Sequence, residues 1–271
     1  MIGEELSAFS EPVTKLVEKV ASAIGVLYEP RRIRRKASAD AEALLISTRA
    51  NIDAKELASR AAYRLTIQEI KYQKNIETIL ENAINYIDHS DTYNEDVDED
   101  FLINFFENCK SVSENELQQL WSKILATTVN GSCTTSRQTL NVLKILSPFD
   151  ARIFEEYSRY IINISNVLFR PKTKYSNLKL SEEGIHIGKI GHLDDLGLIR
   201  MDSVFYLNED VKMKASYCGD ELYFIPKSKS HLRGERLTYA GEQIYNAIGL
   251  AYDEKYLQEV KIYLSNFCKV L

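Results

Sequence analysis

Hydrophobic residues near the N-terminus recur at spacings of three and four, which is the period of one helix face. This stripe runs from Val13 to Leu27, with Pro12 in its first turn and Gly25 near its end. Proline fits a first helical turn because the amide hydrogen that it lacks has no partner there, and glycine readily adopts the backbone conformation that ends a helix. The pattern predicts an amphipathic helix that ends at about Gly25.

The segment from Arg31 to Asn130 contains neither glycine nor proline. A glycine destabilises a helix interior by about 1 kcal/mol and a proline by about 3 kcal/mol, so their absence over this length favours helix. The apolar stripe is clearest from Ile76 to Ile87. We therefore expect one long helix from about Arg31 to Ile87, which must pack against the rest of the chain or against another copy.

Further helices follow this segment. Acidic residues at 94–100 suit the N-terminus of a helix at Phe101–Cys109, because they face the positive end of its dipole. The sequence Ser113-Glu114-Asn115-Glu116 has the form of a capping box and predicts a second helix that ends at Gly131. Two more helices are expected at Arg137–Leu146 and Phe149–Ile164.

Beyond Pro171 the pattern changes, and glycines and β-prone runs become frequent. We expect a short helix at about Ser181–Leu196. Strands are expected at Val204–Leu207 and Glu221–Ile225, which are bounded by Asn, Asp or Gly. The remaining expected elements are a helix that begins after Thr238 and a last helix at Tyr252–Phe267.

These elements predict a mainly α protein with a smaller α+β part. A long N-terminal helix, a helical bundle and a C-terminal α+β domain follow one another along the chain. With 45% hydrophobic and 27% charged residues, the composition is that of an ordinary globular protein. The expected divisions give three parts, residues 1–90, 91–170 and 171–271.

The order of elements in the C-terminal part resembles a winged helix. A helix leads through Leu196-Gly197-Leu198-Ile199 into strands, and Leu237-Thr238-x-x-Gly241 opens the closing helix. Winged helices either read DNA or dock to proteins. Docking is favoured because the expected helix at Ser181–Leu196 offers Lys189 among several acids, whereas a DNA reader needs cations and amides there. The candidate nucleic-acid contacts are Lys227, Lys229, Arg233 and Arg236.

The strongest charge feature is a basic run at the start of the expected long helix. Five cations supply about 5 kcal/mol of attraction to an anionic membrane surface before entropy and salt screening. The neighbouring stripe carries acids and small residues in place of the bulky apolar residues of an interfacial helix. A solvated or partner-facing role is therefore favoured over a membrane or a nucleic acid. The candidate contacts to an anionic partner are Arg31, Arg32, Arg34, Arg35 and Lys36.

No constellation in the sequence points to catalysis, a cofactor or a metal. The four histidines and four widely separated cysteines match no metal, triad or disulfide motif. Ser176 and Lys179 have the spacing of a serine–lysine pair, without its companion motifs. The net charge of -5 argues against a protein that coats nucleic acid with its whole surface. We expect a cytoplasmic, non-enzymatic protein without an export signal or a membrane span.

Several segments along nearly the whole chain carry a family resemblance. They include Gly25–Ala37, Asn75–Ile79, Phe101–Glu107 and Leu120–Ala126. In these segments and in Leu143–Asp150 the chain resembles a bacterial family of unknown function that is related to the Abi-alpha (abortive infection) proteins. The resemblance implies an association with mobile elements and phage defence, and it carries no catalytic residues.

The sequence leads to one main hypothesis and two alternatives. The main hypothesis is a non-enzymatic interaction protein of phage defence that self-associates, or binds a protein partner, through the long N-terminal helix. The first alternative is a DNA-binding regulator that uses the winged-helix-like module. The second is a peripheral effector on an anionic membrane surface. None of the three involves a small-molecule substrate.

Overall fold

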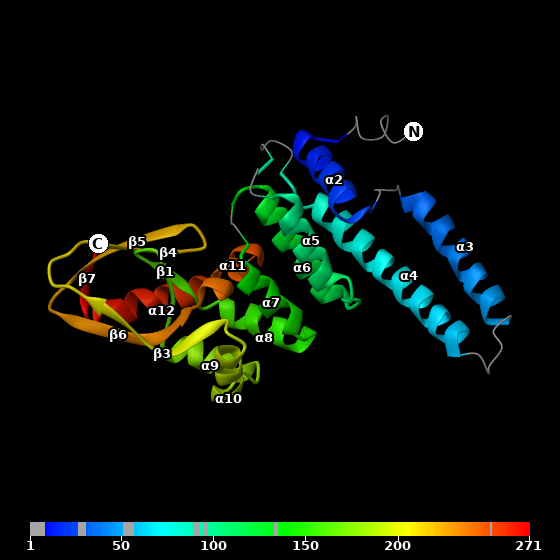
Figure 1. The fold of residues 1–271 in the computed structure, drawn as a ribbon. Helices are drawn as coiled ribbons and strands as arrows, with labels where there is room; N and C mark the ends of the chain where they lie inside the picture. The colour runs from blue at the N-terminus through cyan, green and yellow to red at the C-terminus, as the bar shows by residue number, and fades with distance from the viewer. Residues whose placement is uncertain are drawn as a thin grey trace. The chain divides into compact units, whose positions relative to one another are not determined.

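Helices make up the regular structure of the N-terminal half of the computed structural model, whereas the C-terminal half adds an antiparallel sheet (Figure 1). Contacts between residues divide the chain into two units, Met1–Thr134 and Thr135–Leu271. The helices that we expected in a middle part, residues 91–170, are thus shared between the two units. The structure describes residues 9–26, 31–50, 57–88, 93–94, 97–132, 135–249 and 251–271.

The core of the first unit forms where α4 packs on α6 and α2 packs on α5. Trp121 of α6 is fully buried, and its ring meets the ring of Phe105 edge-to-face at 5.1 Å between centroids. Ser122 lets α4 and α6 approach closely, and its hydroxyl donates to the carbonyl of Ile79 at 2.9 Å. The described helices of this unit are α2 (Glu11–Ile24), α3 (Arg31–Ala50), α4 (Leu57–Ile84), α5 (Glu99–Cys109) and α6 (Asn115–Val129).

The first amphipathic helix is confirmed as α2. It has proline in its first turn, and it ends at Gly25, whose φ of 69° lies in the left-handed region. The Gly25 amide donates to the carbonyl of Ala21, which satisfies one of the last helical acceptors.

The expectation of one long helix over residues 31–87 is wrong. Two helices, α3 and α4, run side by side in opposite directions (Figure 1), and Lys74 of α4 lies 3.3 Å from Glu42 of α3. In a single helix these two residues would be about 48 Å apart. The connection, residues 51–56, lies outside the described residues. The absence of glycine and proline from residues 31–87 therefore does not require a single helix.

The two helix starts predicted in this unit had different outcomes. Asp98 caps α5 as expected, since its carboxylate accepts the amide of Phe101 at 2.7 Å. The capping box at residues 113–116 does not form. Instead, Glu114 occupies the N-cap position of α6 without a side-chain hydrogen bond to the helix. Ser113 thus lies one residue too early to cap α6.

The second unit contains a seven-stranded sheet in which every described pair of neighbouring strands is antiparallel. The strand order is β3-β6-β2-β1-β4-β5-β7, so β3 and β7 are the edge strands. The strands are β1 (Ile162–Ile164), β2 (Val167–Pro171), β3 (Ile199–Leu207), β4 (Met213–Tyr217), β5 (Asp220–Pro226), β6 (Ser230–Leu237) and β7 (Cys268–Val270). The helices are α7 (Arg137–Ile145), α8 (Pro148–Ser158), α9 (Lys174–Glu182), α10 (Ile187–Asp195), α11 (Tyr239–Ala247) and α12 (Glu254–Ser265).

Two helix predictions in this unit need correction. The helix expected at Phe149–Ile164 ends at Ser158, and its last residues form strand β1. The helix expected at Ser181–Leu196 is interrupted by Gly184, whose φ of 68° ends α9 before α10 begins. Apolar residues such as those of β1 fit a buried helix and a buried strand equally well, so the pairing with β2 and β4 decides.

The other helices and strands predicted for this unit are confirmed. The two expected strands lie within β3 and β5, Thr238 is the N-cap of α11, and the last expected helix is α12. The fold is therefore mainly helical with an α+β part, as the sequence predicts.

The start of α11 packs directly on the start of β3. Thr238 accepts the amide of Gly241 through its hydroxyl oxygen and donates to the carbonyl of Gly197. Gly241 leaves no room for a side chain, because a Cβ atom there would lie 1.9 Å from the carbonyl oxygen of Leu198. The two motifs around Gly197 and Gly241 thus meet in space and fix this helix against the sheet.

A buried ion pair lies at the centre of the second unit. Arg170 of β2 and Glu235 of β6 face each other across the two strands, and both side chains are 1% exposed. The guanidinium donates to Glu235 Oε2 at 2.7 and 2.8 Å and to Asn177 Oδ1 at 3.0 Å. The ring of Tyr157 packs against the guanidinium at 5.2 Å. This network joins the sheet to α8 and α9.

Candidate functional site

The predicted nucleic-acid contacts do not gather in one place. Lys227 donates its ammonium group to the carbonyl of Ser265 at 2.8 Å, and Lys229 is exposed in the turn before β6. Arg233 and Arg236 both lie on β6, three residues apart, so that they point to opposite faces of the sheet. The neighbours of Arg233 on its own face include His231, two residues away in β6, and Val204, directly opposite in β3.

The predicted anionic-partner contacts lie in the first two turns of α3. The side chains of Arg31, Arg32, Arg34 and Arg35 are outside the described residues, and Lys36 is exposed. A role of this basic run in binding an anionic partner stays a prediction.

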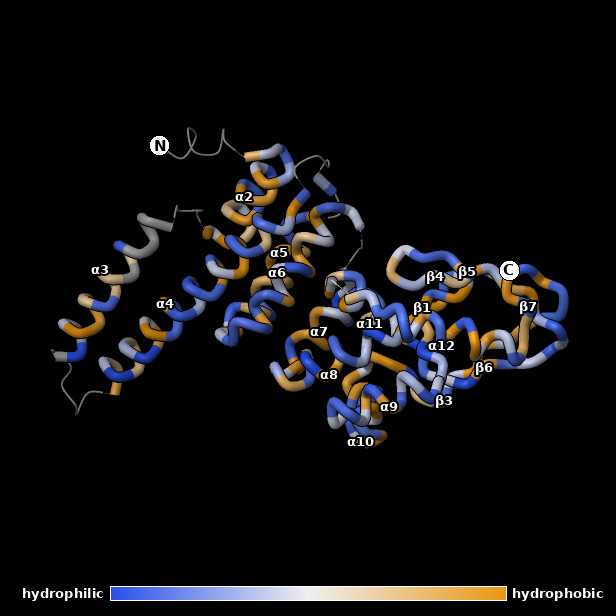
Figure 2. The backbone as a smooth tube through the Cα atoms, turned by 180° about the vertical axis from the view of Figure 1, so that it is seen from behind, coloured by the Kyte–Doolittle hydropathy of each residue, from blue (hydrophilic) through white to orange (hydrophobic). Residues whose placement is uncertain are grey.

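The hairpin of α3 and α4 leaves large apolar side chains in water. Leu44 and Ile46 of α3 are 59% and 72% exposed, and Leu57 and Leu65 of α4 are 74% and 52% exposed. Hydrophobic positions occur along both helices in Figure 2. The buried residues of α4 begin at Asn75, so Leu57 and Leu65 lie on the half of this helix that has no buried residue.

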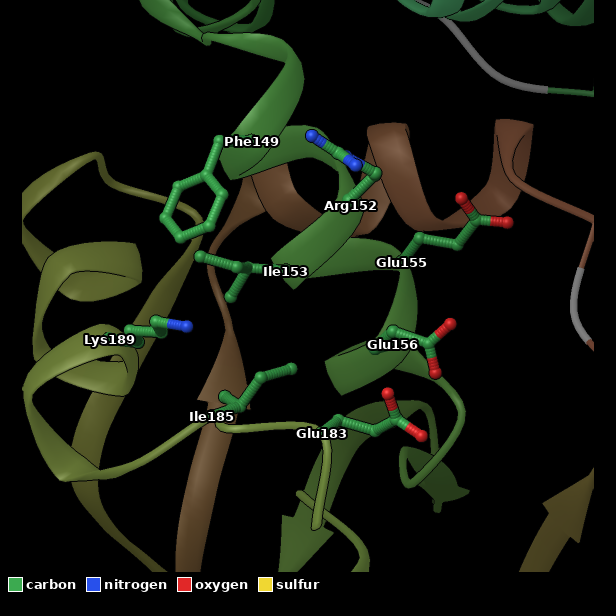
Figure 3. Close-up of a pocket in the computed structure, with 8 residues that line it drawn as sticks. All are labelled: Phe149, Arg152, Ile153, Glu155, Glu156, Glu183, Ile185 and Lys189. Atoms are coloured by element: carbon green, nitrogen blue, oxygen red, sulfur yellow. The ribbon is translucent and has the colours of Figure 1, made fainter. Parts of the chain in front are cut away.

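A cleft of about 500 Å³ opens in the second unit between α8 and the α9–α10 segment (Figure 3). We call it the α8–α10 cleft. At one end Ile153 and Ile185 form an apolar floor, and the ammonium group of Lys189 lies 4.9 Å from the ring of Phe149. The cleft is lined by Phe149, Arg152, Ile153, Glu155, Glu156, Glu183, Ile185 and Lys189.

The other end of the α8–α10 cleft is acidic. The carboxylates of Glu156 and Glu183 extend to the same place from α8 and from the end of α9, with Glu155 above them in Figure 3. The pKa of Glu156 is raised, mainly because the side chain is partly buried. The guanidinium of Arg159, 3.0 Å away, lowers this pKa, whereas the nearby carboxylates of Glu183 and Glu155 raise it. An apolar floor next to mutually repelling carboxylates suits a segment that carries an alkyl group and a cation.

The described residues of this unit do not assemble a catalytic pair from the Ser-x-x-Lys motif. Ser176 is a buried residue in the first turn of α9, and its hydroxyl is hydrogen-bonded to Thr173 and Arg170. Lys179 pairs with the carboxylate of Glu182 at 2.6 Å. The spacing in the sequence therefore reflects a helix cap and a surface ion pair.

Two further searches cover the described part of the chain. No three His, Cys, Asp or Glu side chains in it come together as a metal site would require. Every helix in it is too short or too polar to span a bilayer.

The comparisons with known proteins identify a family. No curated protein and no solved structure matches the chain. One family model does match, over residues 59–261, and its description is "Protein of unknown function (DUF2806)". The matched segment begins within α4 and ends within α12, and thus includes the whole sheet except β7. Since the match covers well over half of the sequence, the chain belongs to the DUF2806 family.

Proposed function

We propose that this protein is a non-enzymatic interaction protein that self-associates through the hairpin of α3 and α4. The observation that carries the proposal is the exposure of Leu44 and Ile46 on α3 and of Leu57 and Leu65 on α4, before the buried residues of α4 begin at Asn75. A pair of helices gains most of its stability from burying an apolar face. The hairpin therefore needs a covering surface.

A second copy of the hairpin is a suitable covering surface. The 20 residues of α3 extend about 30 Å, and two neighbouring helices about 10 Å apart present a face of about 600 Å². This area is of the same order as the roughly 800 Å² that each partner buries in a stable interface. Two such faces form an antiparallel four-helix arrangement. A two-fold contact also places identical apolar side chains opposite one another without any further component.

Light scattering on the purified full chain tests self-association. We expect a dimer at micromolar concentration, and the double variant Leu44→Glu, Leu65→Glu should be a monomer with unchanged helix content. The matched control is Ile262→Glu on α12, where an apolar side chain is 60% exposed outside the hairpin. A wild-type protein that is monomeric at micromolar concentration, or a double variant that remains dimeric, would contradict the proposal.

The second unit supplies a docking module in this proposal. The order α9–α10–β3–β6–α11 follows that of a winged helix, with β4 and β5 inserted between the paired strands β3 and β6. The α8–α10 cleft lies beside the helix that would read DNA in such a module, and its carboxylates favour a basic, partly apolar protein segment over a phosphate backbone. A partner of that chemistry would dock there.

The biological setting in this proposal is phage defence. It rests on the resemblance to the Abi-alpha proteins and on the motifs that carry it, from Gly25–Ala37 to Leu143–Asp150. Bacteria that express the protein should plate phage less efficiently than bacteria that express the double variant Leu44→Glu, Leu65→Glu. Equal plating of a panel of phages with and without the wild-type protein would argue against this setting.

A further inference from the structure

A hollow of about 580 Å³ lies on the sheet at the edge strand β3 and its neighbour β6. We call it the sheet hollow. Two cross-strand pairs form its centre, Val204 opposite Arg233 and Tyr206 opposite His231. Because directly opposite residues of antiparallel strands point to the same face, these four side chains share one surface.

The sheet hollow carries cations in two different states. The ammonium group of Lys172, which directly follows β2, lies 3.3 Å from Asp202 Oδ1 and 3.3 Å from Glu235 Oε1. These two carboxylates hold the lysine in place and balance its charge. In contrast, no described carboxylate forms an ion pair with the exposed guanidinium of Arg233. Arg233 thus has its full charge and its planar donors available for an anionic ligand.

An aromatic platform lies beside these cations. The side chain of Tyr206 is 73% exposed, and its ring centroid is 6.5 Å from that of His231. Val204 adds an aliphatic surface that is 42% exposed. An open aromatic surface on a sheet, next to a guanidinium, is the combination on which unpaired bases stack.

The irregularity of β3 shapes the sheet hollow. The pairing of β3 with β6 shifts between Arg200 and Ser203, and Asp202 has a φ of 51° within this bulge. A bulge bends an edge strand and redirects its side chains. Here it places Asp202 beside Lys172, which holds the lysine at the rim of the hollow.

We infer that the sheet hollow binds single-stranded nucleic acid, with a base stacked on Tyr206 and a neighbouring phosphate bound by Arg233. Bases in a duplex stack on each other and offer no free face to Tyr206, so the surface distinguishes single strands from duplexes. The local charge is compatible with this ligand, because residues 135–271 hold slightly more Lys and Arg than Asp and Glu. The acidic excess of the chain lies in the first unit.

Fluorescence anisotropy of the full chain with a labelled single-stranded oligonucleotide of about 12 nucleotides tests the inference at about 50 mM salt. We expect binding to the single strand and much weaker binding to the duplex of the same sequence. Tyr206→Ala should weaken binding by about 5- to 150-fold, which corresponds to the loss of one stacked base. Arg233→Ala should weaken binding and reduce the slope of log K against log salt by about 0.7.

Matched controls come from exposed residues elsewhere in the second unit. Tyr239→Ala removes a ring that is 60% exposed at the start of α11, and Arg137→Ala removes an exposed guanidinium at the start of α7. Neither should change the affinity, and circular dichroism should be the same for all four variants. No binding to the single strand, equal binding of the duplex, or an affinity that Tyr206→Ala and Arg233→Ala leave unchanged would overturn the inference. A mononucleotide that binds as tightly as the strand would overturn the assignment of a strand as the ligand.

Discussion

The buried pair of Arg170 and Glu235 gives the sharpest stability prediction. Glu235→Gln keeps the shape of the side chain but leaves the guanidinium, which is 1% exposed, without its carboxylate. Removal of one partner of a buried ion pair destabilises a protein by about 3–5 kcal/mol, because a charge then remains in a medium that solvates it poorly. Asn177 and the ring of Tyr157 remain as partners but supply no negative charge.

This free energy should appear as a large fall in the melting temperature of the second unit. For a domain of about its size, 1 kcal/mol lowers Tm by about 4 °C, so we expect Glu235→Gln to lower Tm by about 10–20 °C. The single tryptophan, Trp121, belongs to the first unit, whereas most tyrosines lie in the second. Near-ultraviolet circular dichroism of tyrosine should therefore show the fall, and tryptophan fluorescence should show a smaller one.

Two further variants complete this experiment. Glu182→Gln breaks the exposed pair with Lys179 and should leave the tyrosine transition nearly unchanged. The double variant Arg170→Met, Glu235→Leu removes both charges and should recover much of the lost stability, since an apolar pair can replace a buried ion pair. If Glu235→Gln melts like the wild-type protein, or if the double variant is less stable than Glu235→Gln, our account of this pair is wrong.

Two other predictions concern the second unit. Gly241→Ala should strongly destabilise or abolish the fold of the second unit in thermal unfolding, because the new Cβ atom would overlap the carbonyl oxygen of Leu198. The control Gly249→Ala should be neutral, since no atom lies within 4 Å of its Cβ position. Similar melting of both variants would refute this reasoning. Burial raises the pKa of Asp150, but hydrogen bonds from Ser147 and His192 outweigh burial and hold it below its usual value. A lowered pKa in the folded state stabilises the protein above the unfolded pKa of about 3.9, and this stability is lost as the pH falls through the folded pKa. Asp150→Asn should therefore lower the free energy of unfolding, measured with denaturant, by about 1 kcal/mol at neutral pH and by progressively less below about pH 4. A difference between variant and wild type that stays constant across this pH range would argue against this account.

The sequence was most informative where local chemistry alone places an element. Gly25 ends α2 and Asp98 begins α5, because a left-handed residue and a capping carboxylate act within one turn of the chain. Thr238 likewise caps α11 through its own hydroxyl. Such signals need no distant partner, and for this reason they could be read from the sequence.

The surfaces for binding were less accessible to sequence reasoning. Of the four predicted nucleic-acid contacts, Arg233 lines the sheet hollow. Two other residues that line it, Lys172 and Tyr206, were not predicted from the sequence. The two-residue spacing of His231 and Arg233 was a usable signal for one face of a strand. No spacing could reveal Lys172, because it comes from another strand.

Local signals in the sequence were sufficient to predict a helical N-terminal half, strands in the C-terminal half and the ends of several helices. The three-dimensional structure was needed to show that α3 and α4 run antiparallel (Figure 1), that the residues of β1 pair in a sheet, and that Arg170 meets Glu235. The physical reason is that helix propensity and caps act over a few neighbouring residues. The antiparallel packing of α3 on α4 and the pairing of the strands depend instead on contacts between residues far apart in the chain, which local sequence does not encode.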